Sequence, residues 1–407
     1  MKKVALHWQI LLALVAGGFF GFFVPDGIGY VSWMGDVFLR LLKMVIIPLV
    51  FSTLVTGVAG VGNAENLGRL GLKTMGFYLI TSLLAILTGL VLVNLIQPGI
   101  GAEIGLAAKP VTLGATQNSF TDTLMGIIPV NIFESLMRGD MLPIIFFAIL
   151  FGFFITRLDS RHSRILSSAF TALSELMMRI TMFVIRFTPA GVFGIVAKVI
   201  GEQAGDQQAL LAVTGRLGLY MLTVLVGIFF HGFVTLSLAL KLLANINPLT
   251  HIRTMSSVLL TAFSTSSSNA TLPLTISEIE MKSKVSPAIT GFTLPLGATV
   301  NMNGTALYEC VAVMFIAQAY GIELSFVQQM IVVATALLAA VGSAGIPMAG
   351  LVMMALVMTA VGLPLEGIGL ILAVDRILDM FRTALNVYGD TCAAVVIARS
   401  EGEKVYA

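Results

Sequence analysis

The sequence predicts an all-α polytopic membrane protein with eight transmembrane helices and two re-entrant hairpins. Of its 407 residues, 57% are hydrophobic and 11% are charged, whereas soluble domains usually carry about 25% charged residues. Apolar runs recur at lengths near the roughly 20 residues that a membrane helix needs. In the second half, polar and Gly/Pro-containing breaks interrupt these runs. Such breaks are tolerated at membrane depth only against protein or a cavity, so we expect the functional site there.

The first 245 residues contain six apolar runs that we interpret as ordinary spanning helices. They cover residues 7–24, 37–62, 74–97, 124–156, 165–197 and 209–243. The amino terminus begins with two lysines followed by apolar residues, as a signal peptide does, but no clear small-residue cleavage site follows. We therefore expect the first run to be retained as a spanning helix.

The second half contains two segments that each hold a pair of apolar stretches around a tip of small residues. These segments cover residues 247–285 and 325–365. A re-entrant hairpin fits each of them better than two full crossings. Paired interrupted segments of this kind are typical of transporter binding sites.

Basic residues predict the orientation of the chain in the membrane. The connections after the second, fourth and sixth runs are basic and contain Arg69, Lys73, Arg157, Arg161, Arg164, Lys241 and Arg253. The alternate connections, near residues 99–119 and 200–208, are mainly acidic. Because cytoplasmic loops carry the excess of Lys and Arg, we expect a multi-pass protein of the cytoplasmic (inner) membrane with both termini in the cytoplasm.

The last apolar segment carries three carboxylates, a guanidinium and an amide on one face. At about 100° per residue, these five positions lie within roughly 80° of arc. They are Asp375, Asp379, Arg382, Asn386 and Asp390. A charge at mid-membrane costs on the order of 3 kcal/mol even on the lenient insertion scale, so this stripe should face inward and line a transport site.

The first break in the second half, residues 264–273, is rich in hydroxyl side chains and ends at Pro273. We expect the proline to begin a new helix turn, since proline suits the first position of a helix. The free N–H groups of such a helix amino terminus would bind a carboxylate. Taken alone, the tract would be better interpreted as a Ser/Thr-rich surface loop. Its apolar flanks and the presence of further breaks favour a binding role.

Two further breaks suit other parts of a transport site. Residues 294–305 should unwind a helix in its middle, and unwound carbonyls bind sodium in such proteins. A simple Pro/Gly kink is the alternative, but a kink does not require two asparagines and two threonines. Residues 342–350 form a small-residue tip that could act as a lid, and taken alone would be an ordinary turn.

The charges of the last helix suggest what binds. Asp375, Asp379, Arg382 and Asp390 sum to −2, and Glu309 makes −3 unless burial keeps it protonated. An amino acid with an acidic side chain suits this site, with its amine on Asp379 and its side-chain acid on Arg382 as a bidentate pair. Co-bound cations would balance the remaining charge, and Asp375 would orient the guanidinium.

With these motifs, the sequence resembles the dicarboxylate/amino acid:cation symporter family, the glutamate and aspartate transporters. The resemblance covers essentially the whole chain. It rests on the serine-rich tip, Asn301-Met-Asn-Gly-Thr305, Gly345-Ile-Pro-Met-Ala-Gly350 and Asp379-Met-Phe-Arg-Thr-Ala-Leu-Asn-Val-Tyr-Gly-Asp390. It implies inverted repeats and a homotrimer in which a transport domain moves like an elevator against a scaffold.

The resemblance also implies a division of the chain. The scaffold would comprise residues 1–62, with helices 1 and 2, and residues 99–200, with helices 4 and 5. The transport domain would comprise helix 3 in residues 63–98 and a core in residues 201–407. That core holds helix 6, hairpin 247–285, helix 7, hairpin 325–365 and helix 8.

The same resemblance implies a set of substrate-binding residues. The serine tip, with Asn386, would hold the α-carboxylate, Thr305 and Arg382 the side-chain carboxylate, and Asp379 the amine, with residues 346–350 closing over them. The implied substrate-binding positions are Ser266, Ser267, Ser268, Thr305, Ile346, Ala349, Gly350, Asp379, Arg382, Thr383 and Asn386.

Three sodium sites are implied in the same way. The first would use carbonyls of Gly297, Asn301 and Asn386 with Asp390. The second would use carbonyls of Thr299, Ala340, Val341 and Ser343 when the lid is shut. The third would use Tyr78, Thr81 and Ser82 with Asn301 and Asn303.

The chain departs from the family pattern at position 303, which is usually aspartate and is Asn303 here. A neutral amide is a weaker sodium ligand than a carboxylate, so the third sodium would be weakened, lost or replaced by a proton. Glu309 occupies the place of the proton-carrying glutamate of the animal relatives, which also export potassium. Sodium is therefore expected as a coupling ion, and proton coupling and potassium counter-transport stay open.

The expected function is cation-coupled uptake of glutamate and/or aspartate by a protein that is not an enzyme and has no nucleic-acid partner. Its expected partners are the acidic amino acid, membrane lipid and two further copies of the chain. Four-carbon dicarboxylate or neutral amino acid transport remains an alternative, and an ion channel with possible anion leakage is a more distant one. An intramembrane hydrolase finds no support, because His231 lies on another helix with no recognisable nucleophile motif.

Overall fold

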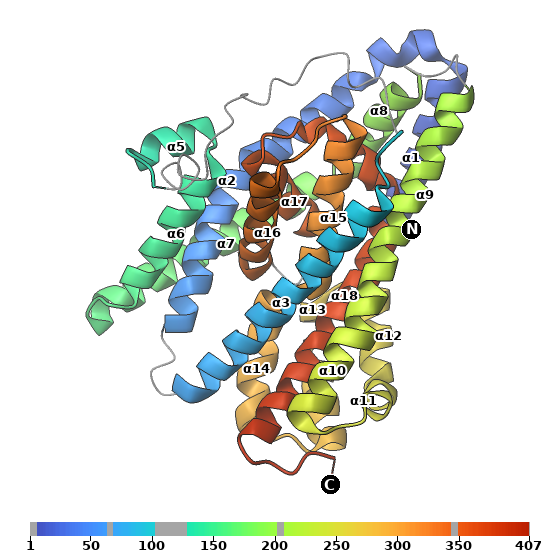
Figure 1. Ribbon diagram of the computed structural model, residues 1–407. Coiled ribbons are helices and arrows are strands. Elements are labelled where there is room, and N and C mark those ends of the chain that lie inside the picture. Colours follow the sequence, from blue (N-terminus) through green and yellow to red (C-terminus); the bar gives the residue numbers. More distant parts are fainter. Residues whose placement is uncertain (1–5, 63–67, 102–127, 202–206, 343–348, 407) are drawn as a thin grey trace, which may run out of the picture.

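The computed structural model describes residues 6–62, 68–101, 128–201, 207–342 and 349–406, and all regular structure within them is helical (Figure 1). In the first half the main helices are α1 Leu6–Phe23, α2 Ser32–Gly62, α3 Gly68–Ile96, α5 Ile132–Arg138, α6 Met141–Ile155, α7 Ser160–Ile185 and α8 Thr188–Gly201. A 3₁₀ turn, η1 Pro25–Tyr30, joins α1 to α2. The predicted all-helical class is confirmed for these residues.

The second half is more interrupted. Its main helices are α9 Gln207–Phe230, α11 Pro248–Thr254, α12 Ser256–Thr265, α13 Ser268–Glu278, α14 Pro287–Val300, α15 Asn303–Ala319, α16 Phe326–Gly342, α17 Ala349–Ala360 and α18 Ile368–Ser400. Shorter helical pieces continue or join them at η3 His231–Leu236, α10 Ser237–Ala239, η4 Leu240–Ala244, η5 Ile279–Ser283 and η6 Leu365–Gly367.

Five helices in the described part of the chain are long and apolar enough to cross a membrane. They cover Ser32–Ala59, Arg69–Ile96, Ser160–Ile185, Gly215–Ala244 and Pro287–Ala319. Shorter apolar helices accompany them, while α18, which carries the charged stripe, is not among the five. The protein is therefore a multi-pass membrane protein, and the predicted eight crossings with two hairpins remain a prediction.

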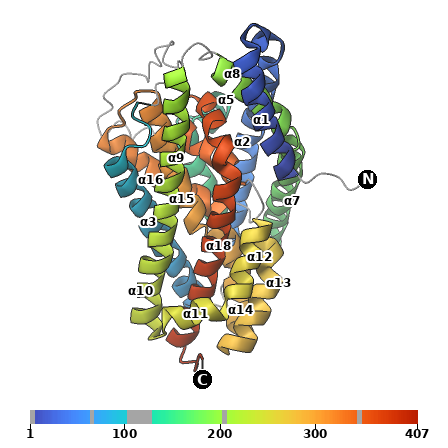
Figure 2. The ribbon, with the colours of Figure 1, turned by 90° about the vertical axis from the view of Figure 1, so that its right-hand side faces the viewer.

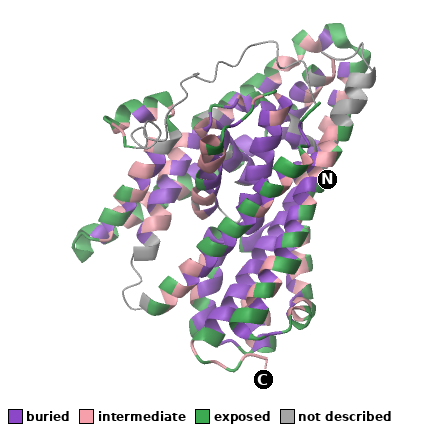
Figure 3. Ribbon diagram, viewed as in Figure 1, coloured by how far each residue is buried: buried purple, intermediate pink, exposed green. Residues whose placement is uncertain are grey.

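The helices pack into two groups (Figures 1 and 2). In one, α2 packs on α6, α7 and α8, and α1 packs on α8. In the other, α15 packs on α3 and α9, and α18 packs on α12, α14 and α15. The most extensive packing between the groups is made by α16 and α17 against α2 and α6, and by α18 against α8. The purple core in Figure 3 follows α15 and α18, so the site region lies at the centre of the second group.

Two of the predicted long runs are broken. Within the predicted run 124–156, the described residues from 128 onward contain α5 and α6, because Gly139 ends α5 in a left-handed conformation (φ 77°). Residues 165–197 form α7 and α8 with a turn between them. The helix α7 begins where the Asp159 side chain accepts hydrogen bonds from the backbone N–H groups of residues 161 and 162, which is an ordinary N-cap.

The first hairpin forms at the predicted tip, where α12 and α13 pack against each other. Ser266 has a left-handed backbone (φ 51°) that ends α12, and the Ser267 side chain caps α13 by accepting from the backbone N–H of Ala270 at 3.2 Å. The expectation that Pro273 opens the helix is wrong. The serine cap starts α13 at Ser268 and leaves Pro273 inside the helix, since Ser is a strong N-cap residue.

The second break is present but narrower than predicted. The helix α14 ends at Val300 and α15 begins at Asn303, with Asn301 and Met302 in non-helical conformations between them. Pro295 lies inside α14 and does not end it. The third predicted break falls mostly on residues 343–348, which lie outside the described residues.

The carboxyl-terminal tail crosses the ends of several helices. The backbone N–H of Tyr406 donates to the Ser283 carbonyl at 3.0 Å, and Glu403 accepts from the backbone N–H of Ser286 at 3.0 Å. Glu401 pairs with Lys73 at 2.6 Å and with Arg69. The tail therefore joins the end of α18 to the start of α3 and to the base of the first hairpin.

Candidate functional site

All five residues of the predicted stripe on α18 are buried. Their exposed fractions are Asp375 1%, Asp379 6%, Arg382 1%, Asn386 4% and Asp390 3%. Their shared face is turned into the core, as the helical spacing predicts. The inward orientation of the stripe is confirmed. The helix α18 itself is too polar in composition to be recognised as a spanning helix.

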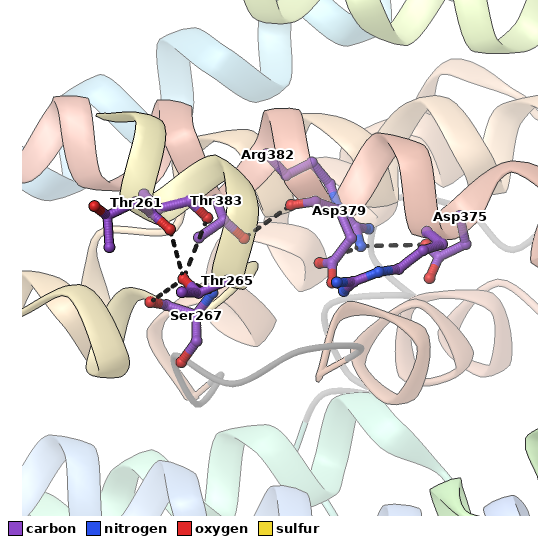
Figure 4. Close-up of polar contacts among 9 residues, drawn as sticks. Thr261, Thr265, Ser267, Asp375, Asp379, Arg382 and Thr383 are labelled. Atoms are coloured by element: carbon purple, nitrogen blue, oxygen red, sulfur yellow. Dashed lines mark hydrogen bonds and ion pairs between the residues drawn. The ribbon is translucent and has the colours of Figure 1, made fainter. Parts of the chain in front are cut away.

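Arg382 is held by two carboxylates and one aromatic ring. Its Nη2 atom lies 2.8 Å from Asp379 Oδ1 and 3.2 Å from Asp375 Oδ1 (Figure 4). The guanidinium also lies over the Tyr308 ring, 3.8 Å from its centroid, a cation–π contact. Its Nε and Nη1 atoms have no hydrogen-bond partner among the described residues. Because buried donors are normally paired, these two N–H groups point to an anionic ligand.

Two other elements approach the same guanidinium. A methyl group added at Gly350, near the start of α17, would lie 3.0 Å from Arg382 Nη1 and 3.3 Å from Thr305 Cγ2. Asn386 fixes the start of α15, because its Oδ1 accepts from the Gly304 N–H at 2.8 Å and its Nδ2 donates to Thr305 Oγ1 at 3.2 Å. The structure thus brings Thr305, Gly350, Arg382 and Asn386 together.

The serine tip lies beside the same stretch of α18. Ser266, Ser267 and Ser268 are buried, and α12 packs along α18. Figure 4 shows Ser267 and Thr265 next to Thr383, whose hydroxyl donates to the Asp379 carbonyl at 2.8 Å. Ser266 Oγ has no partner among the described residues. Hydroxyl groups from the hairpin and charged groups from α18 therefore lie on adjacent surfaces.

A second polar cluster lies farther along α18, around Asp390. Asp390 Oδ1 accepts a hydrogen bond from Asn301 Nδ2 at 2.8 Å, while Asn301 Oδ1 has no partner among the described residues. A methyl group added at Gly297 would lie 2.6 Å from the Tyr78 hydroxyl and would also clash with Asp390. Carboxylate, amide and carbonyl oxygens are the ligands that hard cations prefer, so these residues fit the first predicted sodium site.

The third predicted sodium set fits less well. Ser82 Oγ donates to Asn303 Oδ1 at 2.7 Å, Thr81 donates to the Phe77 carbonyl at 2.8 Å, and Tyr78 donates to the Thr293 carbonyl at 2.8 Å. Asn303 Nδ2 is buried without a partner among the described residues. The side chain at 303 therefore presents a hydrogen-bond donor where a cation needs an acceptor.

The second predicted sodium set is only partly described. The Thr299 side chain is exposed and bonds the Leu296 carbonyl at 3.0 Å, Ala340 is buried and Val341 is half-buried. Ser343 and Ile346 lie outside the described residues, and Ala349 begins α17. The helices α14 and α16 that would supply the carbonyls pack against each other.

Glu309 lies on α15, one turn beyond Thr305, with 0% of its side chain exposed. Neither of its carboxyl oxygens has a hydrogen-bond partner among the described residues. Burying a charged group without a partner is costly. The position of Glu309 is compatible with the predicted proton-coupling role, which stays a prediction.

Sequence reasoning missed Tyr308, which forms the floor beneath Arg382. Its spacing could have identified it, because Tyr308 follows Thr305 by three residues and so shares its helix face. The close approach at Gly297 was missed for a different reason: the clash with Tyr78 and Asp390 depends on three helices that only the fold brings together.

Comparison with known proteins shows which family the chain belongs to. The model of the sodium:dicarboxylate symporter family matches residues 6–400. The chain belongs to this family. The resemblance inferred from the motifs is therefore confirmed, and the protein is a symporter by membership. This agrees with the expectation of a transporter and not an enzyme, and it disfavours the channel and hydrolase alternatives.

Several curated relatives are similar over most of their length. The proton/glutamate-aspartate symporter of Escherichia coli (strain K12) is 37% identical, with 98% of this chain and 93% of that protein covered. The proton/sodium-glutamate symport protein of Bacillus caldotenax is 36% identical, with 99% and 96% covered. The excitatory amino acid transporter 1 of Ambystoma tigrinum is 32% identical, with 98% and 83% covered.

Proposed function

We propose that this symporter takes up glutamate and/or aspartate across the cytoplasmic membrane by cation-coupled secondary active transport. The observation that carries the proposal is the buried Arg382 guanidinium, which keeps two N–H groups unpaired toward Thr305 and Gly350. A second carboxylate on the substrate would accept from Nη1, on the side of the guanidinium that faces Thr305 and Gly350. The printed names of the bacterial relatives, which are glutamate or glutamate-aspartate symporters, support the same substrate class.

In this proposal each end of the substrate has its own group. The side-chain carboxylate binds Arg382 and Thr305, and the amine binds Asp379. The α-carboxylate lies at the serine tip, where the N–H groups that begin α13 favour an anion and Asn386 assists. Residues 346–350 and Thr383 complete the enclosure. Four-carbon dicarboxylates lack the amine that Asp379 requires, and neutral amino acids lack the second acid, so both are disfavoured.

The proposed coupling uses cation sites along α14, α16 and α18 and a proton-carrying carboxyl on α15. Asp390 and the unpaired Asn301 Oδ1 would hold a sodium ion together with backbone carbonyls at Gly297 and Asn386. When bound, the cation neutralises the excess negative charge of α18. The second sodium site would form from carbonyls of Thr299, Ala340, Val341 and Ser343. Glu309 is the proposed carrier of a coupled proton.

The larger assembly follows the family pattern in this proposal. The chain forms a homotrimer with both termini in the cytoplasm. Helices 1, 2, 4 and 5 form a scaffold, and helix 3, helices 6 to 8 and the two hairpins form a transport domain that moves as an elevator. The separate packing of the two helix groups, joined mainly through α16, α17 and α18, supports this division.

Uptake measurements test the proposal directly. Full-length protein in sealed proteoliposomes should accumulate radiolabelled aspartate or glutamate when a sodium or proton gradient is imposed, with each gradient applied separately. Succinate and alanine should compete poorly. Failure to accumulate either amino acid under any ionic gradient would overturn the proposal, and equal uptake of succinate would redirect it to dicarboxylates.

A further inference from the structure

An apolar crevice lies between the two helix groups, away from the stripe on α18. Its cavity volume is about 510 Å³, within the range of small-molecule sites. Leu54 and Val58 of α2 and Phe153 of α6 line one side. Met75 and Leu79 of α3 and Leu338 of α16 line the other. The proposed transport function assigns no ligand to this space, although Val341, whose carbonyl is proposed for the second sodium site, also lines it.

One charged residue, Arg157, lines the mainly apolar crevice, next to Thr156. Arg157 follows the end of α6, and its guanidinium lies over the Phe153 ring, 5.2 Å from the centroid. No ion pair to Arg157 is found among the described residues. The nearby Asp159 does not neutralise it, because the Asp159 carboxylate pairs with His162 and caps α7. The crevice thus combines apolar walls with an unpaired cation at its rim.

Two further arginines lie near this end of the helices but do not line the crevice. Arg161 and Arg164 are exposed at the start of α7, and positive charge at this end of the helices is what the positive-inside pattern places on the cytoplasmic side. Basic pockets between helices on that side bind the headgroups of anionic lipids. In a membrane, the molecule available to fill an apolar crevice with a cationic rim is such a lipid.

We propose that an anionic phospholipid binds in this crevice, with its phosphate at Arg157 and an acyl chain between Val58, Leu79 and Leu338. The lipid then contacts both helix groups at once, because α2 and α6 belong to one and α3 and α16 to the other. A bound lipid should therefore stabilise the arrangement seen here. This binding does not depend on the proposed substrate or coupling ions.

Lipid titration of the full-length protein in detergent, followed by native mass spectrometry, tests this proposal. The wild-type protein should retain phosphatidylglycerol better than phosphatidylcholine with the same acyl chains. Arg157→Gln should weaken phosphatidylglycerol binding about five-fold, which corresponds to about 1 kcal/mol for one cationic residue near an anionic headgroup. Arg164→Gln, the matched control, removes the same charge outside the crevice and should change binding little.

A second variant tests the acyl-chain part. Leu79→Trp should reduce retention of both lipids by filling the crevice, and Met75→Phe serves the same purpose if the first variant does not fold. Equal retention of the two lipids by the wild type would overturn the proposal, as would equal effects of Arg157→Gln and Arg164→Gln. Because no transport is measured, a negative result leaves the proposed transport function standing.

Discussion

Arg382 and Asp379 form an ion pair of 2.8 Å across one turn of α18, with both side chains buried. These are the two groups proposed to bind opposite ends of the substrate. Without substrate they neutralise one another, so the site does not leave either charge buried alone, which would be costly. We infer that the amine and the side-chain carboxylate of the substrate replace this internal pair while Asp375, at 3.2 Å, keeps the guanidinium in place.

Arg382→Lys should weaken acidic amino acid uptake about ten- to a hundred-fold. A lysine retains the positive charge beside Asp375 and Asp379, so folding should survive. It cannot form the planar two-point contact with a carboxylate, and a hydrogen bond to a charged group contributes about 1.5–3 kcal/mol. The KM for glutamate and aspartate in proteoliposomes measures this effect.

The control for that measurement is Arg399→Lys, at the exposed end of the same helix. It should leave the KM unchanged. An Arg382→Lys protein with wild-type affinity for both amino acids would show that the guanidinium does not bind the substrate.

Gly297→Ala should abolish sodium-dependent uptake. The added methyl group would lie 2.6 Å from the Tyr78 hydroxyl and would clash with Asp390, so the carboxylate must leave its position beside Asn301. Gly291→Ala on the same helix meets no atom within 4 Å and should be tolerated. Sodium-induced thermal stabilisation of the two purified variants separates ion binding from transport. Equal sodium responses would argue against a cation site at Asp390.

Asn303→Asp should increase the dependence of uptake on sodium. It replaces the unpaired Nδ2 donor with a carboxylate oxygen near Ser82, and a carboxylate is the stronger ligand for a hard cation. The apparent sodium affinity and the Hill slope of uptake should both rise. If both remain at wild-type values, the residue at 303 does not determine the number of coupled sodium ions.

The tail contact should make stability depend on pH. Hydrogen bonds from Lys73 and Arg69 lower the pKa of Glu401 below its ordinary value of 4.5. A lowered carboxyl pKa stabilises the folded protein above pH 4.5, and this stabilisation is lost as the pH falls through the folded-state pKa. The Tm of the wild type should therefore fall more steeply with acidification than that of Glu401→Gln. Parallel Tm curves, or an effect that salt does not reduce, would contradict this.

The fold class and the inward stripe on α18 could be predicted because both depend on local patterns. Composition reveals a membrane protein, and helical spacing alone brings Asp375 and Asp390 onto one face. Pro273 misled the prediction, because the serine cap at Ser267, six residues earlier, decided where α13 begins. The proline was the more conspicuous signal but not the stronger one.

The cation cluster could not be built from local patterns. Tyr78, Gly297 and Asp390 come from α3, α14 and α18, and their convergence depends on how those helices pack. The role of Tyr308 beneath Arg382 likewise requires α15 and α18 to be adjacent. The resemblance to the family predicted Tyr78, Gly297 and Asp390 as ion ligands, which helical periodicity alone could not do, but it did not predict Tyr308.

The contacts of residues 401–406 have a practical consequence for labelling the protein. Glu403 and Tyr406 form hydrogen bonds with backbone groups at the base of the first hairpin. An affinity tag or fluorescent protein fused directly to the carboxyl terminus would therefore disturb these bonds next to the proposed binding site. A flexible spacer before such a fusion should preserve these bonds, and the choice of fusion end is therefore a functional decision.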